Sequence, residues 1–582
     1  MGDQSRIILV NFDLMASTRR LRLILLALVA AVAVAHPRGA SGDPVRARHG
    51  MVGSADEHAS RAGLRVLQQG GNAVDAAVAV GFALAVTHPA AGNLGGGGFM
   101  VIRLADGRET TIDYREAAPA GARRDMFLDS AGQPVADRSL IGPLASGVPG
   151  SVAGMALAQK RYGRLPLADV MAPAIALARD GFEVSWALAD SLGSAQSLLA
   201  TYPASARAFR RADGTMPDPG DRLVQRDLAA TLTLIADQGP DAFYKGAIAD
   251  LIAAEMARSG GLITKADLSA YTPRERPPIV GSYRGHRVVS MPPPSSGGIA
   301  LVQLLNILER FPLADYGHNS SRSIHLVAEA ARRVYADRSE WLGDPDFFDV
   351  PVAGLLSRRY ADALRSGISE TRATSSRDVK PGQPRTFEHS ETTHFSVVDA
   401  DGNAVAATTT LNGSYGNGQM VTGAGFLLNN EMDDFSAKPG TPNMFGLIGG
   451  EANAVGPGKR MLSSMTPTIL VKDGKTRLVV GSPGGGRIIT TVLQVVLNVV
   501  DFKMNVQEAV DAPRFHHQWL PDVIRLERQG FPADVVTALE AMGHTTEVGA
   551  DMGEVHAIMI DEATGLRLGA SDPRQDGRTL GY

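Results

Sequence analysis

Residues 392–411, TTHFSVVDADGNAVAATTTL, decide the character of the second half of the chain. The stretch 392–398 is rich in residues that favour strands, and 399–403 supplies Asp, Gly and Asn for a turn. Residues 404–411 then return as a threonine-rich strand. The segment therefore predicts a β-hairpin that begins with a threonine.

A second hairpin is predicted further along, with strands at 468–471 and 477–480. Its turn, Gly474-Lys475-Thr476, imitates the end of a phosphate-binding loop, but Ile469 stands where that motif requires its first glycine. The turn is therefore interpreted as structural.

The first half contains a nearly unbroken Ala/Val run at 74–86, long enough for a helix that is buried on most sides. The glycine-rich stretch 93–98 follows this run and has no Lys-Ser/Thr pair. It therefore predicts a tight turn into a strand at 99–104, not a phosphate cradle.

The middle of the chain, from about 150 to 374, shows helical spacing, as in 324–341. From about 386 onward the pattern changes to short strands with glycine turns, and no long Pro/Ser linker separates the two parts. We therefore expect two halves of one fold and not two independent domains.

Composition excludes several function classes. The net charge of −4 and the scattered basic residues argue against nucleic acid as a partner. The absence of cysteine excludes disulfides, thiolate nucleophiles and Cys-based metal sites. A nucleophile must then be Ser, Thr, Lys or a carboxylate, and the motifs of serine hydrolases (G-x-S-x-G) and zinc proteases (H-E-x-x-H) do not occur.

Residues 1–35 are interpreted as a signal peptide, with Met15 as an alternative start. Three arginines precede an apolar run at 23–35 that ends in the small-x-small site Ala33-Val34-Ala35. The run is too short to span a bilayer, although an uncleaved anchor or a buried helix is the alternative. The prediction is a periplasmic or secreted protein with no stable membrane anchor after signal cleavage.

Beyond these local patterns, the sequence closely resembles the γ-glutamyltranspeptidase family of N-terminal nucleophile hydrolases over almost the whole mature chain. The matching motifs follow one another in the family's order: NLGGG (93–97), DYRE (113–116), MPPPSSGG (291–298), YADRS (335–339), ETTHFS (391–396), LNNEMDDF (428–435), LSSM (462–465), GSPGG (481–485) and GASDPR (569–574).

The resemblance implies an α/β (α+β) fold, a four-layer αββα sandwich formed jointly by two autoprocessed subunits. Cleavage between Glu391 and Thr392 would give a large subunit of residues 36–391 and a small subunit of residues 392–582. A threonine hydroxyl is a poor nucleophile without a base, but a free α-amino group titrates near ~8 and can take its proton. Cleavage creates that amine on Thr392 itself.

The implied activity is that of a γ-glutamyltransferase and glutathione hydrolase. Thr392 would take the γ-glutamyl group from glutathione or a related amide and pass it to water, an amino acid or a peptide. No metal and no organic cofactor is implied. The alternatives are a cephalosporin or glutaryl acylase on the same fold, and an exported solute-binding or structural protein that is never processed.

The resemblance also assigns a binding site for the two charges of the glutamyl group. Arg115 would pair the α-carboxylate, and the hydroxyls of Ser463 and Ser464 would add hydrogen bonds. Taken alone, Arg115 would form a surface ion pair with Asp113 or Glu116. The α-ammonium would be held by acceptors at three positions, Glu431, Asp434 and the amide of Asn412; Asp433 is expected to lie in a solvated acidic turn.

The remaining assignments concern the reaction itself. Backbone NH groups of Gly484 and Gly485 would bind the oxyanion, and Thr410 would orient Thr392. The histidines are interpreted as structural: His394, His516 and His517. A lid at 438–450 carries Phe445, where several bacterial relatives have a tyrosine that latches the closed pocket by its hydroxyl.

Overall fold

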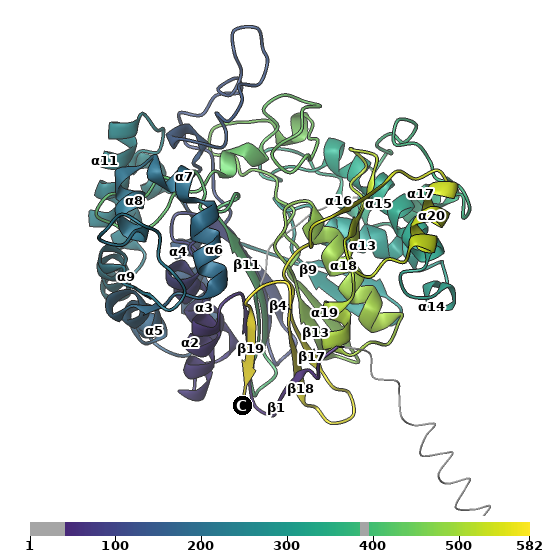
Figure 1. Ribbon diagram of the computed structural model, residues 1–582, viewed down its shortest axis with the longest axis horizontal. Coiled ribbons are helices and arrows are strands. Elements are labelled where there is room, and N and C mark those ends of the chain that lie inside the picture. The colour runs from purple at the N-terminus through teal and green to yellow at the C-terminus, as the bar shows by residue number, and fades with distance from the viewer. Residues whose placement is uncertain (1–40, 385–394) are drawn as a thin grey trace, which may run out of the picture. The chain divides into compact units, whose positions relative to one another are not determined.

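In the computed structural model, which describes residues 41–384 and 395–582, two seven-stranded antiparallel sheets face each other (Figure 1). The first sheet has the order β1(Val45–Ala47), β18(Arg567–Ser571), β17(His556–Ile560), β13(Lys475–Val480), β12(Thr468–Lys472), β9(His286–Ser290), β8(Ile279–Tyr283). The second has the order β19(Arg578–Gly581), β2(Met51–Ser54), β10(Phe395–Val398), β11(Ala404–Thr410), β3(Gly97–Arg103), β4(Glu109–Asp113), β7(Arg274–Arg276).

Helices cover the outer face of each sheet. On the second sheet, α3(Ala73–Thr87) packs on β10 and β11, while α2(Glu57–Gln68) packs on β2 and β19. On the first sheet, α13(Gly297–Leu308) packs on β8 and β9, and α19(Val506–Asp511) packs on β17 and β18. The predicted four-layer αββα arrangement is confirmed.

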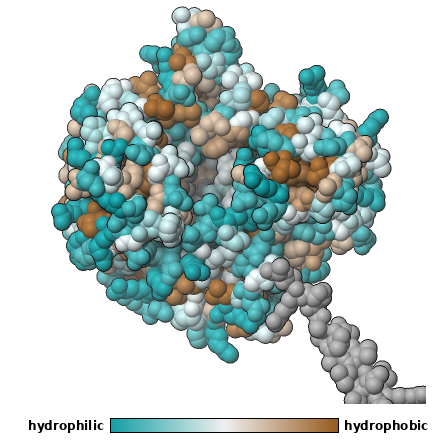
Figure 2. All heavy atoms as spheres, viewed as in Figure 1, coloured by the Kyte–Doolittle hydropathy of each residue, from teal (hydrophilic) through white to brown (hydrophobic). Residues whose placement is uncertain are grey.

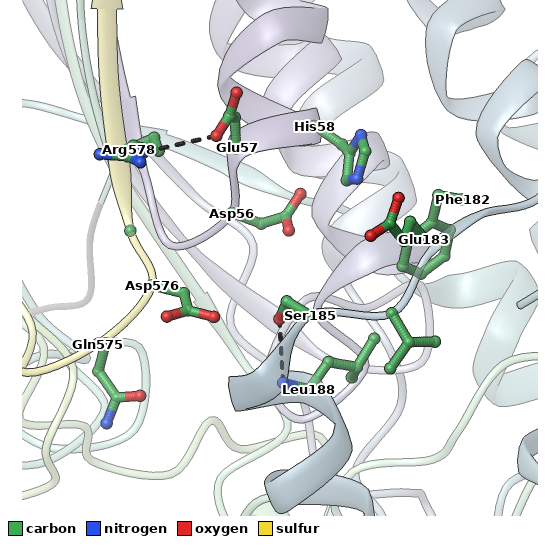
Figure 3. A pocket seen from close by; sticks show the side chains of 12 residues that line it. Asp56, Glu57, His58, Phe182, Glu183, Ser185, Leu188, Gln575, Asp576 and Arg578 are labelled. Atoms are coloured by element: carbon green, nitrogen blue, oxygen red, sulfur yellow. Dashed lines mark hydrogen bonds and ion pairs between the residues drawn. The ribbon is translucent and has the colours of Figure 1, made fainter. Parts of the chain in front are cut away.

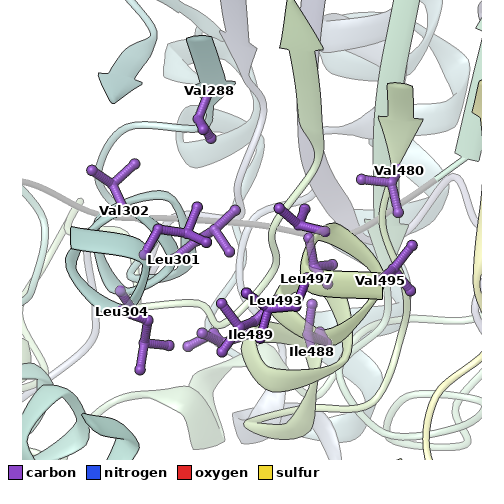
Figure 4. Close-up of a cluster of buried hydrophobic side chains, with 14 of the residues drawn as sticks. Val288, Leu301, Val302, Leu304, Val480, Ile488, Ile489, Leu493, Val495 and Leu497 are labelled. Atoms are coloured by element: carbon purple, nitrogen blue, oxygen red, sulfur yellow. The ribbon is translucent and has the colours of Figure 1, made fainter. Parts of the chain in front are cut away.

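Two further helices complete the layer over the first sheet, α18(Arg487–Val500) and α15(Ser321–Trp341). Figure 4 shows the core there, where Leu301 and Leu304 of α13 lie close to Ile489 and Leu493 of α18. These side chains are fully buried, which is the main source of stability for such a layer.

The predicted hairpin that begins the second half of the chain is confirmed for its described part. β10 and β11 pair antiparallel with Phe395 opposite Ala407. The Asp399 carboxylate closes the turn by accepting from the backbone NH groups of Gly402 (3.0 Å) and Asn403 (2.9 Å). Residues 385–394, which include Glu391, Thr392 and His394, lie outside the described residues.

The other local predictions are also confirmed. The Ala/Val run forms α3, every residue of which is buried, and a capping box of Asn72 and Asp75 begins it. The glycine-rich stretch after it leads into β3, and Gly474 lies in the turn between β12 and β13.

The prediction that residues 150–374 are helical is correct for most of this region but misses five strands. Most of them are short, and the pair β8–β9 joins the first sheet. Along β8 the side chains of Ile279 and Tyr283 are buried while Val280 points outward, which is the period of a strand. The turn at Arg284 and Gly285 has positive φ at both residues, as a two-residue hairpin requires.

The remaining elements surround these layers. They are η1(Pro143–Ala145), α4(Ser151–Tyr162), α5(Leu167–Asp180), β5(Phe182–Glu183), α6(Trp186–Ser194), α7(Gln196–Ala200), α8(Pro203–Phe209), β6(Arg222–Leu223), α9(Arg226–Gln238), α10(Asp241–Tyr244), α11(Ala247–Ser259), α12(Lys265–Ala270), α14(Leu313–Tyr316), α16(Val352–Leu355), α17(Arg358–Ser366), η2(Glu431–Asp434), η3(Glu451–Asn453), β14(Phe515–His516), β15(Ile524–Glu527), α20(Ala533–Ala541) and β16(Thr546–Gly549).

Both sheets combine strands from the two halves of the chain. In the second sheet β10 lies between β2 and β11, and β11 lies beside β3. In the first sheet β12 pairs with β9. The expectation of two halves of one fold is therefore confirmed, because neither half contains a complete sheet.

On the face shown in Figure 2, most of the surface is hydrophilic or intermediate and hydrophobic residues form separate patches. Within the described ranges, no helix combines the length and the apolar character that a membrane crossing demands. The predicted signal segment, residues 1–35, lies outside the described residues.

Candidate active site

A pocket of about 420 Å³ brings together most of the residues predicted for the site. They come from separate parts of the chain: the end of β11, the loop after it, η2, the loop before β12 and the loop before α18. The predicted residues that line it are Thr410, Asn412, Glu431, Asp434, Ser463, Ser464, Gly484 and Gly485. Glu391 and Thr392 lie outside the described residues.

Arg115 lies beneath this pocket and is fully buried, so the alternative of a surface ion pair is wrong. Its guanidinium donates to Glu431 Oε1 and, at 2.5 Å, to Asp434 Oδ2, while its Nε donates to the carbonyl of Met461 at 3.2 Å. Burial opposes the charge of Arg115, but these carboxylates outweigh it and raise its pKa. The cation is therefore fixed directly under two residues of the pocket.

Glu116 is a buried carboxyl group beside this cluster. Sequence analysis assigned it no role in the site. Burial raises its pKa to about 7, against the opposing effect of Arg115. Arg115 Nη1 lies 3.9 Å from Glu116 Oε2, which is beyond hydrogen-bond reach. Neither oxygen of Glu116 nor Oε2 of Glu431 has a hydrogen-bond partner among the described residues. Burial raises the pKa of Glu431 and of Asp434 as well.

The loop 482–486 carries the predicted oxyanion donors to the N-terminal end of α18. Gly484 and Gly485 have φ of +132° and +56°, conformations that L-residues rarely adopt. Their carbonyls accept from the NH groups of Arg487 and Ile488, each at 3.1 Å, so the loop is continuous with the first turn of the helix. The partial positive charge of that helix end favours an anion here.

Two hydroxyls in the pocket have neighbours that fix them. Ser464 Oγ accepts from the Arg338 guanidinium at 3.1 Å, and the same guanidinium donates to Ser296 Oγ at 2.7 Å. Thr410 Oγ1 accepts from the NH of Asn412 at 2.8 Å. The motifs around Ser296 and Arg338 thus support the pocket from behind.

Ser463 and Asn412 are held by the backbone. The NH of Ser463 donates to the carbonyl of Pro294 at 3.1 Å, and the Asn412 side chain donates to the carbonyl of Asn430 at 3.0 Å. Asn412 has φ of +75°, which turns the chain sharply after β11.

The predicted lid, Lys438–Gly450, contributes Met444 and Phe445 to the pocket wall. The Phe445 ring packs against Gly485 so closely that a Cβ at that glycine would overlap it. Asp433 anchors the lid by accepting from the NH of Met444 at 3.0 Å and from Ser139 Oγ at 2.6 Å. The expectation of a solvated Asp433 is therefore wrong, because its side chain is buried in these bonds.

Of the three histidines predicted to be structural, His516 and His517 are described, and both are buried. His516 lies between Thr490 Oγ1 and Gln518 Oε1, each 2.8 Å from a ring nitrogen, and burial lowers its pKa to about 3. His517 contacts Asp522 at 3.2 Å, and burial lowers its pKa too. Neither lines the pocket.

A larger cavity of about 550 Å³ has only Gln575 in common with this pocket and lies between α2, the start of α6 and the segment before β19 (Figure 3). Its wall is acidic, with Asp56, Glu183 and Asp576 beside His58. It contains none of the residues predicted for catalysis. The smaller pocket is therefore the candidate active site.

The pocket also includes residues that sequence analysis did not assign. Two loops near the C-terminus complete its wall, and they contribute Asp551, Gly553, Glu554, Arg574 and Gln575. Only Arg574 belongs to a recognised motif; the loop around Gly553 carries no local pattern that marks it.

Comparisons with known proteins identify the family of the chain. A family model described as gamma-glutamyltranspeptidase matches residues 59–582. The glutathione hydrolase proenzyme of Escherichia coli is 56% identical over 540 residues, which cover 93% of each chain. Among solved structures, cephalosporin acylase from Bacillus halodurans has a TM-score of 0.83 at 30% identity and covers 94% of this chain and 98% of its own.

A chain of Helicobacter pylori gamma-glutamyltranspeptidase has a TM-score of 0.56 at 45% identity. It is matched over 97% of its own length but covers 60% of this chain. The pocket above the Arg115 cluster lies within the matched region, and the match extends to the last residue. The chain is therefore an enzyme that belongs to the γ-glutamyltranspeptidase family.

Proposed function

We propose that this enzyme is an autoprocessing γ-glutamyltransferase and glutathione hydrolase. The observation that carries the proposal is the charged cluster under the pocket, where Arg115 is buried with Glu431 and Asp434. A γ-glutamyl donor has an α-carboxylate and an α-ammonium on one carbon. A guanidinium and two carboxylates side by side offer a partner of opposite sign to each.

The donor is thus oriented with its charged end toward Arg115. The α-carboxylate takes hydrogen bonds from Arg115 and from the hydroxyls of Ser463 and Ser464. The α-ammonium binds Glu431 and Asp434, where it replaces part of their contact with Arg115. The side-chain amide oxygen of Asn412 is a third acceptor. The scissile carbonyl then lies toward Gly484 and Gly485, whose NH groups stabilise the oxyanion; one such donor contributes ~3 kcal/mol.

Autoprocessing starts with attack of the Thr392 hydroxyl on the carbonyl of Glu391. The peptide C–N bond breaks as an ester forms, and water hydrolyses the ester to leave a free α-amino group on Thr392. We also propose that Thr410, at the end of β11, orients the Thr392 hydroxyl.

The large subunit is proposed to be residues 36–391 and the small subunit residues 392–582. The relatives' name "proenzyme" and the length of the Helicobacter pylori chain support such a division. We also propose export by residues 1–35 to the periplasm or the outside; an N-terminus of the mature protein other than residue 36 would contradict that boundary.

Thr392→Ala tests the reaction. The variant should run as one full-length band on a denaturing gel and should not hydrolyse a γ-glutamyl anilide, because it lacks the hydroxyl for both steps. The neighbouring variant Thr393→Ala is the matched control and should still give two bands. A full-length Thr392→Ala protein that hydrolyses the anilide would defeat the proposal.

An acylase activity is the second candidate, since the Bacillus halodurans structure named cephalosporin acylase has the same fold. A glutaryl anilide differs from the γ-glutamyl anilide only by the missing α-ammonium, so the pair of substrates separates the two activities. The enzyme should hydrolyse the γ-glutamyl substrate faster than the glutaryl substrate. The double variant Glu431→Gln, Asp434→Asn should bring the two rates closer together. A wild-type preference for the glutaryl substrate supports the acylase instead.

A further inference from the structure

A further cavity, of about 760 Å³, adjoins the candidate active site. The two have Ser414, Arg574 and Gln575 in common in their walls, so they meet at these residues. From there the outer cavity extends along α6, where Trp186 and Asp190 line it, to Asp576. It is an outer compartment on the side of the pocket that carries these shared residues.

The wall formed by α6 is fixed to the active-site loops. The NH of Ala187 donates to Asp576 Oδ2 at 3.3 Å, and Ser191 Oγ is 2.8 Å from the hydroxyl of Tyr415. Tyr415 follows the pocket residues Asn412–Ser414 directly. The helix α6 is therefore held against the same loop that forms the pocket. A ligand bound in the outer cavity would then lie at a fixed distance from the reacting carbonyl.

Trp186 is 74% exposed, the largest value among the exposed large hydrophobic side chains of the described residues. Asp190 lies four residues further on, one helical turn away on the same side of α6. Asp190 is exposed, and its carboxylate makes no hydrogen bond or ion pair with a described residue. An indole face beside a carboxylate is the arrangement that binds an ammonium or guanidinium group.

The other charges around the cavity do not cancel this preference. Arg574 is engaged by Glu527 at 2.7 Å and by Asp572 at 3.1 Å, so its charge is neutralised within the protein. Asp576 adds a second carboxylate. Beyond the Ala187–Asp576 contact the surface remains acidic, since Asp56 and Glu183 lie in the neighbouring cavity (Figure 3). The outer compartment therefore favours positive charge.

We propose that this compartment is an acceptor subsite for short peptides with a basic side chain, and that Trp186 and Asp190 bind that side chain. The inference rests on the proposed transfer reaction. The neutral α-amine of the peptide attacks the ester carbonyl of the Thr392 acyl-enzyme; the new amide bond forms, the ester C–O bond breaks and the amine's proton returns to the threonine oxygen. The peptide's second residue then points along α6, away from Arg115.

The test compares Gly-Arg, Gly-Gly and Gly-Asp as acceptors with a saturating γ-glutamyl anilide, and measures the γ-glutamyl tripeptide products by mass spectrometry. The KM for Gly-Arg should be roughly 5- to 10-fold below that for Gly-Asp, as one cation–π contact and one ion pair imply. The double variant Trp186→Ala, Asp190→Asn should bring the two KM values to within about twofold, with the kcat of transfer little changed.

The matched control is Phe347→Ala with Asp237→Asn, an exposed aromatic and an exposed carboxylate outside both cavities, which should keep the preference. Equal KM values in the wild type, or a preference that persists in the double variant, overturns the inference. Hydrolysis of the anilide without peptide separates the two proposals. If the enzyme hydrolyses the anilide but shows no preference for Gly-Arg over Gly-Asp, only the proposed subsite is wrong. If the enzyme does not hydrolyse the anilide, the proposed function is wrong.

Discussion

The carboxyl of Glu116 is fully buried next to Arg115, and the resulting rise of its pKa to about 7 links protonation to folding. The folded state holds this proton more tightly than the unfolded chain, whose glutamates titrate near 4.3. The stabilisation is therefore fully present below the unfolded pKa and is lost as the pH rises through about 7.

Glu116→Gln should consequently change how stability depends on pH. Glutamine has nearly the same shape as glutamate but does not titrate. The melting temperature of the variant should therefore rise relative to that of the wild type between pH 5 and pH 8. Thermal melts across that range measure the difference. The exposed Glu540→Gln serves as the control and should follow the wild type; a Glu116→Gln curve parallel to the wild type contradicts the coupling.

At this residue level the sequence could predict which side chains gather but not how deeply they lie. The family motifs gave Arg115, Glu431 and Asp434, and the structure brings these three together. Glu116 is buried where Gly97, Gly147 and the Arg115–Glu431 pair come together, and Glu431 is more than 300 positions away in the chain. No local pattern around DYRE carries that information.

Among the elements, the loop before α18 and the lid act as one unit, because the Phe445 ring rests on Gly485. Gly485→Ala should lower kcat by about 10²–10³-fold, since a Cβ there meets the ring and the positive φ is strained, and both effects move the oxyanion donors. Steady-state hydrolysis of a γ-glutamyl anilide measures this.

The matched control is Gly474→Ala in the β12–β13 turn. That glycine also has positive φ, but a Cβ there has open space around it. It should cost some stability and leave kcat unchanged. Equal loss of kcat in both variants would point to a general folding defect instead of a displaced oxyanion site.

The elements differed in how well the sequence predicted them. The helix α3 and the hairpins β10–β11 and β12–β13 have strong local signals, namely a long Ala/Val run and glycine or Asp-Gly turns. The β8–β9 hairpin was missed because its strands have five residues each and it turns at Arg284-Gly285 between helical stretches. Its place is decided by pairing with β12, a contact distant in sequence.

Over the whole molecule, the interleaving of strands predicts how a cleaved chain behaves. Separation of residues 392–582 from the rest would break the pairing of β10 with β2, β11 with β3 and β12 with β9. The two fragments should therefore elute together in gel filtration and unfold in one calorimetric transition, and separate only in denaturant. Two independent transitions contradict a shared core.

The last strand, β19, pairs with β2, and the NH groups of Arg48 and His49 donate to the carbonyl of Tyr582 at 3.0 and 2.7 Å. The end of one proposed subunit thus lies beside the start of the other. A circularly permuted gene, in which a short Gly/Ser linker joins Tyr582 to Pro44, could begin translation at Met-Thr392 and end at Glu391. Removal of the initiator methionine would then expose the α-amino group of Thr392 without any self-cleavage. Turnover could then be measured in a protein that does not depend on maturation.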